Sequence, residues 1–338
     1  MIQKNKAPFV LISSVIILLL LILVSISLGY ANTSVIDVLK LISGKSDDAF
    51  LFIITNFIIT NIRLPRIIVC IFGGASLGIA GLLLQTLTKN PLADSGILGI
   101  NAGAGLVIAL TIGTFNVSNP TILYFLPLFA MFGGLVTIFL IYLMSYRRNH
   151  NISPTRLIVT GIGISTIISG VMISIISQSN NQKMDMIVEW LSGKITISSW
   201  TTIITFIPIL ILLWGLAYSR SRHLNIMNLN EQTALALGLH LKKERIYTLM
   251  LTSSLAAISV VLIGNITFIG LLAGHLSRRL LGNNHKIILP SCLLIGAIIL
   301  LVSDTIGRLL LVGTGIPTGL VVSIIGAPYF LWLMTKVD

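Results

Sequence analysis

The feature that most constrains this chain is a long apolar stretch around residue 75 that is crowded with small residues. These are Gly73, Gly74, Ala75, Ser76, Gly78, Ala80 and Gly81. A helix that only anchors a protein in lipid has no use for them. Small residues let helix backbones approach closely in a membrane, where lipid gives helices no hydrophobic reason to associate. The stretch therefore predicts the packed interior of a membrane helix bundle.

The composition extends this prediction to the whole chain. Of its 338 residues, 55% are hydrophobic and only 9% are charged, whereas soluble domains usually carry about 25% charged residues. No stretch is polar enough to form a separate soluble domain of even ~50 residues. We therefore predict a single transmembrane domain over residues 1–338.

Ten apolar stretches approach or exceed the roughly 20 residues that a membrane-spanning helix needs. They cover residues 9–29, 62–87, 93–113, 121–144, 155–177, 199–218, 246–264, 267–281, 287–303 and 316–335. The first is longer than the apolar region of a signal peptide, which has about 7–15 residues, so we interpret it as a span. The pattern predicts an all-α polytopic membrane protein with about ten transmembrane helices.

The net charge of +12 is best explained by membrane orientation. With the N-terminus inside, 15 of the 22 Lys and Arg residues lie on the inner side of the predicted spans and 7 on the outer side. This asymmetry follows the positive-inside rule. Basic residues form no run with interleaved aromatic residues, so we expect no nucleic-acid partner. We predict a multi-pass membrane protein with both termini cytoplasmic.

The sequence predicts neither catalytic activity nor ion coupling by this chain. The predicted spans hold almost no ionisable side chains, which an intramembrane enzyme or ion-coupled carrier would need. Asp94, in a loop, is the nearest candidate for a proton-coupled carrier. The sequence has no P-loop or nucleophile elbow and no cluster with metal-ligand spacing. We expect a transport subunit without catalytic residues, bound metal or cofactor.

The longest predicted cytoplasmic loop, residues 219–245, contains a short helical pattern. Asn230 and Glu231 offer capping chemistry at its start, and Gly238 is suited to its end. Such a helix either lies on the membrane surface or docks a cytoplasmic partner. A transporter without an internal ionic coupling site needs energy from elsewhere, so we favour docking of an ATP-hydrolysing subunit.

Several separated motifs resemble the permease subunits of ABC importers for iron–siderophore complexes, haem and vitamin B12. The motifs, which span nearly the whole chain, are Arg63-Leu-Pro-Arg66, Gln85, Asn90-Pro-Leu-Ala93, Leu98-Gly99, the run from Gly264 to His275, Arg278-Arg279, Asp304, Arg308 and Gly326-Ala-Pro-Tyr-Phe330. The resemblance implies the ten-helix type II importer permease fold and a place in the bacterial cytoplasmic membrane. It also implies import of a ferric siderophore, with the hydroxamate type as one candidate and haem or cobalamin as alternatives.

The resemblance further implies partners and the residues that meet them. The partners would be a second permease subunit, two cytoplasmic ATPase subunits that bind ATP and Mg, and an extracytoplasmic substrate-binding protein. Arg63, Arg66 and Arg308 match arginines that dock the binding protein; snorkelling, or pairing of Arg308 with Asp304, is the alternative explanation. Residues of the loop match the family's coupling helix, namely Glu231, Ala234, Ala236, Leu237, Gly238 and Lys242.

Pathway residues are suggested by polarity near membrane depth. The candidates are Gln85, Asn90, Asn101 and Asn265, for which a role in helix packing is the alternative. The chain departs from the family where Glu-x-Pro-x-Gly usually precedes the last span, because Ile316 occupies the acidic position. This departure favours a heterodimer in which the other permease retains the acid.

Overall fold

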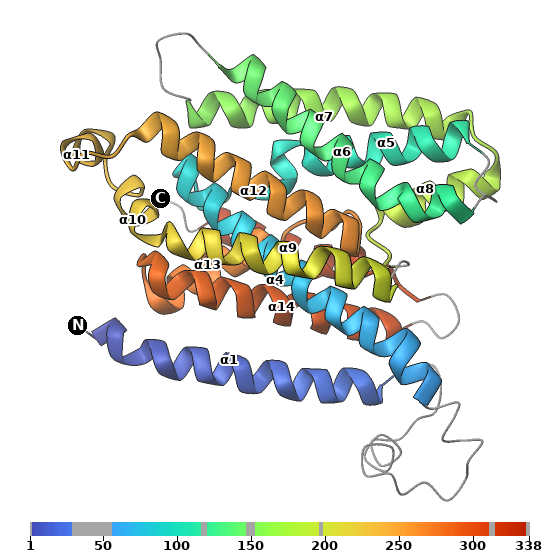
Figure 1. The fold of residues 1–338 in the computed structure, drawn as a ribbon, viewed down its shortest axis with the longest axis horizontal. Helices are drawn as coiled ribbons and strands as arrows, with labels where there is room; N and C mark the ends of the chain where they lie inside the picture. Colours follow the sequence, from blue (N-terminus) through green and yellow to red (C-terminus); the bar gives the residue numbers. More distant parts are fainter. Residues whose placement is uncertain are drawn as a thin grey trace, which may run out of the picture.

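The computed structural model describes residues 2–28, 56–115, 120–146, 153–195, 199–310 and 315–335. Its helices run side by side in one elongated bundle (Figure 1). In chain order they are α1 (Ile2–Ser27), the π-helical turn η1 (Ile59–Arg63), α4 (Leu64–Thr88), the 3-10 turn η2 (Ser95–Leu98), α5 (Ile100–Thr114), α6 (Pro120–Ser145), α7 (Pro154–Ser177), α8 (Asn181–Leu191), α9 (Trp200–Ser219), α10 (Ser221–Met227), α11 (Glu231–Ala236), α12 (Leu241–Ile263), α13 (Ile269–Leu281), α14 (His285–Leu310) and α15 (Thr318–Met334).

The predicted all-α membrane fold is confirmed, since each of the ten predicted spans coincides with a helix. Seven of the described helices are long and apolar enough to cross a membrane, and α5 and α15 are shorter apolar helices. The third span begins later than predicted, at Ile100 rather than residue 93. Lys89 ends α4 in the left-handed conformation, and Gly99, with φ of +70°, separates the 3-10 turn from α5.

Helix α4 is the centre of the bundle and packs against α14, α12, α13 and α9. Nearly all of its residues from Gly73 onward are buried. A Cβ atom added to Gly74 would lie 2.5 Å from the carbonyl oxygen of Gly296 in α14. One added to Gly81 would lie 2.3 Å from Cα of Gly270 in α13. The small residues therefore serve close helix packing, as the sequence predicts.

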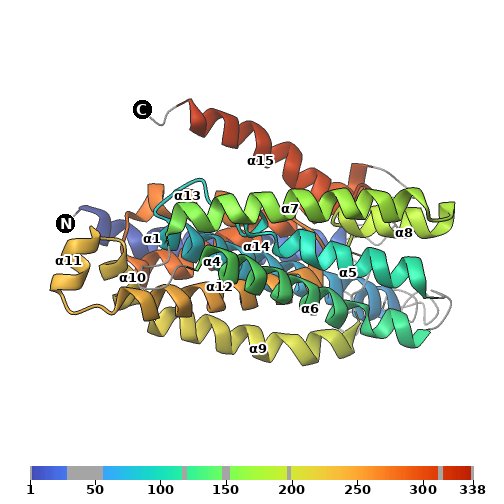
Figure 2. The ribbon, with the colours of Figure 1, turned by 90° about the horizontal axis from the view of Figure 1, so that it is seen from above.

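The bundle has two distinct ends. Helix α1 begins, and α15 ends, at the end where α11 projects from the body, which we call the α11 end (Figures 1 and 2). The other end, where α1 and α14 end and α4 begins, is called the arginine end. Helix α15 is set off from the rest of the bundle in the second view (Figure 2). The described ends of the chain thus lie on one side, as predicted, while the cytoplasmic identity of that side stays a prediction.

Candidate functional site

A shared carboxylate organises the arginine end. Asp304 of α14 is 1% exposed, and its two oxygens accept hydrogen bonds from different arginines. Arg66 Nε lies 2.9 Å from Oδ1, and Arg308 Nε lies 3.0 Å from Oδ2. Thr318 Oγ1, at the start of α15, also donates to Oδ1 at 3.0 Å. Asp304 therefore joins α4, α14 and α15, while the two arginine side chains keep 25% and 16% of their surface exposed.

The end of α1 completes this cluster. Arg63 is 4% exposed and donates a hydrogen bond to the carbonyl of Ile26. Arg308 donates to Ser25 Oγ at 2.6 Å and to the carbonyl of Leu28 at 3.3 Å. The Arg308–Asp304 pairing considered from the sequence is therefore present. Arg66 and Arg308 reach the surface and Arg63 is buried beneath it; docking by all three stays a prediction.

At the opposite end, α11 ends as the sequence predicts. Gly238, with φ of +79°, donates its N–H to the carbonyl of Leu235, and Leu239 donates to that of Ala234. This pair of bonds is a Schellman motif, which favours glycine at the left-handed position. Asn230 occupies the N-cap position as expected, but its side chain makes no capping hydrogen bond.

The predicted coupling residues divide into a buried and an exposed set. Ala234 is fully buried, whereas Ala236, Leu237 and Gly238 are exposed. Leu237 keeps 59% of its surface accessible. Glu231 forms an ion pair with the buried Arg245 of α12. The helix is therefore held to the bundle on one side and presents small and apolar groups on the other.

A polar network that sequence reasoning missed lies between this loop and the bundle. In α10, Asn225 Oδ1 accepts a hydrogen bond from the backbone N–H of His285 and lies 2.8 Å from its Nδ1. His285 Nε2 is 2.8 Å from Thr86 Oγ1 in α4. Arg278 of α13 donates to the same hydroxyl at 2.7 Å. One buried imidazole thus connects α10 and α14 to α4, which in turn meets α13.

The pathway candidates occupy different environments. Gln85 is 3% exposed and packs against α13, where a Cβ on Gly274 would lie 2.5 Å from its Oε1. Asn101 is 5% exposed at the start of α5. Asn90 instead accepts from the N–H of Leu92 and shapes the turn after α4. Among the described residues, Gln85 Oε1, both polar atoms of the Asn101 amide and Asn265 Oδ1 are buried without a hydrogen-bond partner.

Asp94 lies in the segment between α4 and α5, and its burial was not predicted from the sequence. Although it lies in a loop, it is 6% exposed. Its Oδ2 accepts from the N–H of Phe268, which precedes α13 and has a left-handed φ of +69°. A Cβ on Gly270 would lie 2.7 Å from the other carboxylate oxygen. The partial positive charge at the N-terminal end of α13 stabilises a carboxylate at this position. Asp94 therefore connects the segment between α4 and α5 to the start of α13, which is distant in sequence.

The described residues contain no group of three or more His, Cys, Asp or Glu side chains that could hold a metal ion. The fold and these two polar ends define a class: a polytopic helical membrane protein whose polar groups lie at its two ends and at breaks between helices. Comparison with known proteins gives the family. The sequence model of the FecCD transport family matches residues 17–336, and this chain belongs to that family.

Individual relatives support the same placement. The chain is 33% identical to the iron(3+)-hydroxamate import system permease protein FhuG of Bacillus subtilis, over 99% of both chains. It is 32% identical to the hemin transport system permease protein HmuU of Yersinia pestis, over 94% of each. A solved structure described as an inward-facing metal-chelate type ABC transporter superposes with a TM-score of 0.81 at 29% identity, covering 98% of this chain and 100% of that one. The type II ABC permease fold is therefore confirmed.

Proposed function

We propose that this chain is the transmembrane permease of an ATP-driven importer that carries a ferric siderophore across the cytoplasmic membrane by alternating access. The observation that carries this proposal is the end-to-end similarity to FhuG. That similarity also makes a ferric hydroxamate the first substrate to test. Haem is an alternative, because the similarity to HmuU is almost as high, and cobalamin is another, because a vitamin B12 import permease is also similar.

The α11 region supports the proposed docking of ATPase subunits. Leu235 and Leu237 expose 54% and 59% of their surfaces at the α11 end. Burying them on a partner removes apolar area from water, at about 25 cal/mol per Å². Ala236 and Gly238 would allow close approach, while Glu231 and Lys242 would form the polar rim. The buried Ala234 would fix the helix to the bundle.

The network around His285 offers a path from this docking surface to the helix breaks. Helix α10 immediately precedes α11 and is hydrogen-bonded through Asn225 to α14. Thr86 and Arg278 continue the connection to α4 and α13. A displacement of the loop on ATP binding would therefore move these helices together, as rigid-body alternating access requires. The free energy for this shift would come from the different affinities of the two states for nucleotide.

Two further surfaces fit the proposed partners. At the arginine end, Arg66 and Arg308, with Arg63 beneath them, would receive acidic residues of a substrate-binding protein. Helix α15 is set off from the rest of the bundle (Figure 2). It therefore exposes large apolar residues, among them Leu320, Ile324 and Leu331. They suit a second permease, and Ile316 favours a non-identical one. Gln85, Asn90, Asn101 and Asn265 remain the proposed polar groups of the pathway.

Uptake of labelled iron tests the function directly. Cells with and without this chain are offered ferric hydroxamate, ferric catecholate and haem, with labelled cobalamin in parallel. We expect loss of ferric hydroxamate uptake on deletion and its inhibition by vanadate. Loss of haem or cobalamin uptake instead would reassign the substrate. Uptake that resists vanadate but stops with a protonophore would overturn the ATP-driven mechanism.

A coupling-loop variant sharpens the test. Leu237→Asp places a charge on the exposed face of α11 and should abolish uptake while leaving the amount of protein in the membrane unchanged. Leu229→Asp is the matched control, because Leu229 is also exposed, at 44%, but precedes α11. Equal uptake by the two variants would contradict docking through α11.

A further inference from the structure

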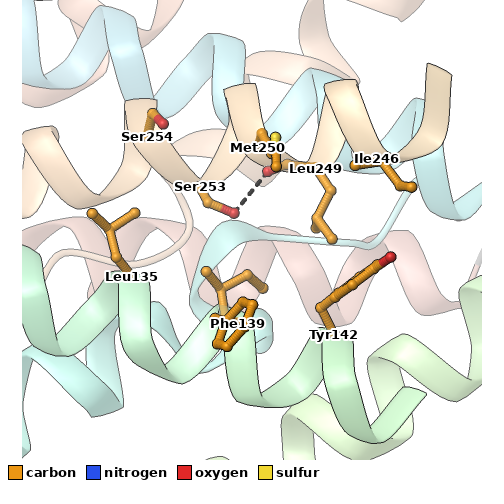
Figure 3. Close-up of a pocket in the computed structure, with 9 residues that line it drawn as sticks. Leu135, Phe139, Tyr142, Ile246, Leu249, Met250, Ser253 and Ser254 are labelled. Carbon is orange, nitrogen blue, oxygen red and sulfur yellow. Dashed lines mark hydrogen bonds between the residues drawn. The ribbon is translucent and has the colours of Figure 1, made fainter. Parts of the chain in front are cut away.

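A groove on the side of the bundle lies between α6 and α12 and runs toward the α11 end, away from the arginine end. Its volume is about 370 Å³. Leu135, Phe139 and Tyr142 of α6 face Ile246 and Met250 of α12 across it (Figure 3). Ser253 also lines the groove, but its hydroxyl donates to the carbonyl of Leu249 within α12. Apart from these residues and Ser254, the lining consists of aliphatic side chains.

The groove opens to the outside of the helix bundle. Phe139 and Met250 at its rim expose 58% and 64% of their surfaces, and Leu135 exposes 37%. Both helices are among those long and apolar enough to cross a membrane, so an exposed apolar face on them suits contact with lipid. An empty groove would leave its lining atoms without dispersion partners. Its walls extend about 10 Å along α6 from Leu135 to Tyr142, at 1.5 Å per residue, which suits part of an extended acyl chain.

The α11 end of the groove carries positive charge and aromatic rings. The Lys242 ammonium lies 5.3 Å from the ring centroid of Tyr146, and that ring lies 6.0 Å from the ring of Tyr142. Lys242 precedes Ile246 by one helical turn, so its charge stands where the groove reaches the end of the bundle. Lys243 is also exposed. Aromatic residues and lysines of this kind collect at the level of lipid headgroups.

We propose that this groove is a binding site for an anionic phospholipid of the leaflet at the α11 end. One acyl chain lies between Leu135 and Tyr142, and the phosphodiester pairs with Lys242. Cationic sites between helices near a membrane surface favour anionic headgroups for this reason. The site needs no transport partner, and it gives Lys242 a role separate from the predicted ATPase rim.

Lipid binding to the purified, delipidated full-length chain in detergent tests the site. Dioleoyl phosphatidylglycerol and dioleoyl phosphatidylcholine are titrated separately, and bound lipid is counted by native mass spectrometry. We expect phosphatidylglycerol to bind about fivefold more tightly, as expected for one lysine near a headgroup. Lys242→Gln should remove this preference, because it weakens binding of phosphatidylglycerol more than binding of the zwitterionic phosphatidylcholine.

Filling the groove separates this site from general lipid adhesion. Leu135→Trp should weaken binding of both lipids at least fivefold, because the larger ring occupies the acyl position. Leu143→Trp is the matched control, since Leu143 is an exposed leucine of α6 that does not line the groove. Met250→Trp, at the exposed rim, is a second filling variant should the first fail to fold.

Three results would overturn the proposal. The first is equal affinity for the two lipids in the wild type. The second is wild-type lipid binding by both groove-filling variants. The third is a disulfide between Met250→Cys chains in native membranes, which would place a second protein chain in the groove instead of lipid. Both native cysteines, Cys70 and Cys292, are buried, so such a cross-link would report on the groove.

Discussion

Replacing Gly74 by alanine is expected to push α4 and α14 apart. The new Cβ would lie 2.5 Å from the Gly296 carbonyl oxygen and 2.8 Å from Cβ of Leu300. Neither atom can move away by a side-chain rotation, because one is backbone and the other is fixed directly to it. The central helix of the bundle must therefore shift against one of its main neighbours.

The magnitude follows from the two opposing effects of this substitution. Overpacking of a tight core costs about 1–3 kcal/mol, while alanine gains up to about 1 kcal/mol over glycine inside a helix. We therefore expect Gly74→Ala to lower the free energy of unfolding by about 1–2 kcal/mol. Gly163→Ala is the matched control, because its Cβ would meet nothing within 4 Å, and it should be neutral or slightly stabilising.

The two variants are compared by unfolding in detergent, followed by the fraction that still elutes as a single species in size-exclusion chromatography. Gly74→Ala should lose this species at a lower temperature than both the wild type and Gly163→Ala. Equal stability of the two variants would show that α4 and α14 do not approach as closely as described, and the packing argument for the small residues would fail.

Further predictions concern the two polar ends. Asp304→Asn leaves two arginines without their carboxylate and should destabilise the protein by about 3 kcal/mol, seen as a lower unfolding temperature; an unchanged value would contradict the shared ion pair. His285→Ala should lower uptake more than ATP hydrolysis in the assembled importer, because the imidazole contacts that join Asn225 of α10 to Thr86 of α4 are lost while the backbone hydrogen bond to Asn225 remains; a parallel fall in both would indicate a purely structural role. Gly238→Val forces a β-branched residue into φ of +79°, at a cost of about 1–2 kcal/mol, and should reduce co-purification of the ATPase, whereas normal recovery would argue against docking through α11.

The apolar pattern was sufficient to predict the helices because each span must satisfy its own backbone within the membrane. Helix α8 was not predicted, since its sequence mixes charged residues such as Lys183 and Glu189 with apolar ones and lacks the length of a span. The delayed start of α5 depends on local backbone conformations at Lys89 and Gly99. These are not visible in hydropathy.

The sequence could predict a polar contact between residues close in the chain, but not contacts between residues on helices distant in sequence. Arg308 and Asp304 are four residues apart, so their pairing follows from helical spacing. Arg66 meets the same carboxylate across 238 positions of sequence, and His285 meets Asn225 across 60. Such pairs depend on how the helices assemble. Asp94 lies in a loop, as its neighbours in sequence predict. Its burial was not predictable, because it results from contact with the start of α13.

The sharing of one carboxylate by Arg66 and Arg308 also has a kinetic consequence. Together with Arg63 at the same end, they make three guanidinium groups and one buried carboxylate, which present to an approaching acidic protein a net charge of about two, rather than three. Electrostatic steering weakens as charge falls and as salt screens it, with a Debye length of about 8 Å at physiological ionic strength. For the proposed binding-protein partner, encounter rates at the arginine end should therefore depend less steeply on salt than they would with three unpaired arginines. Dissociation likewise need not separate the partner from two arginines that have no other carboxylate to pair with, because Arg66 and Arg308 keep Asp304.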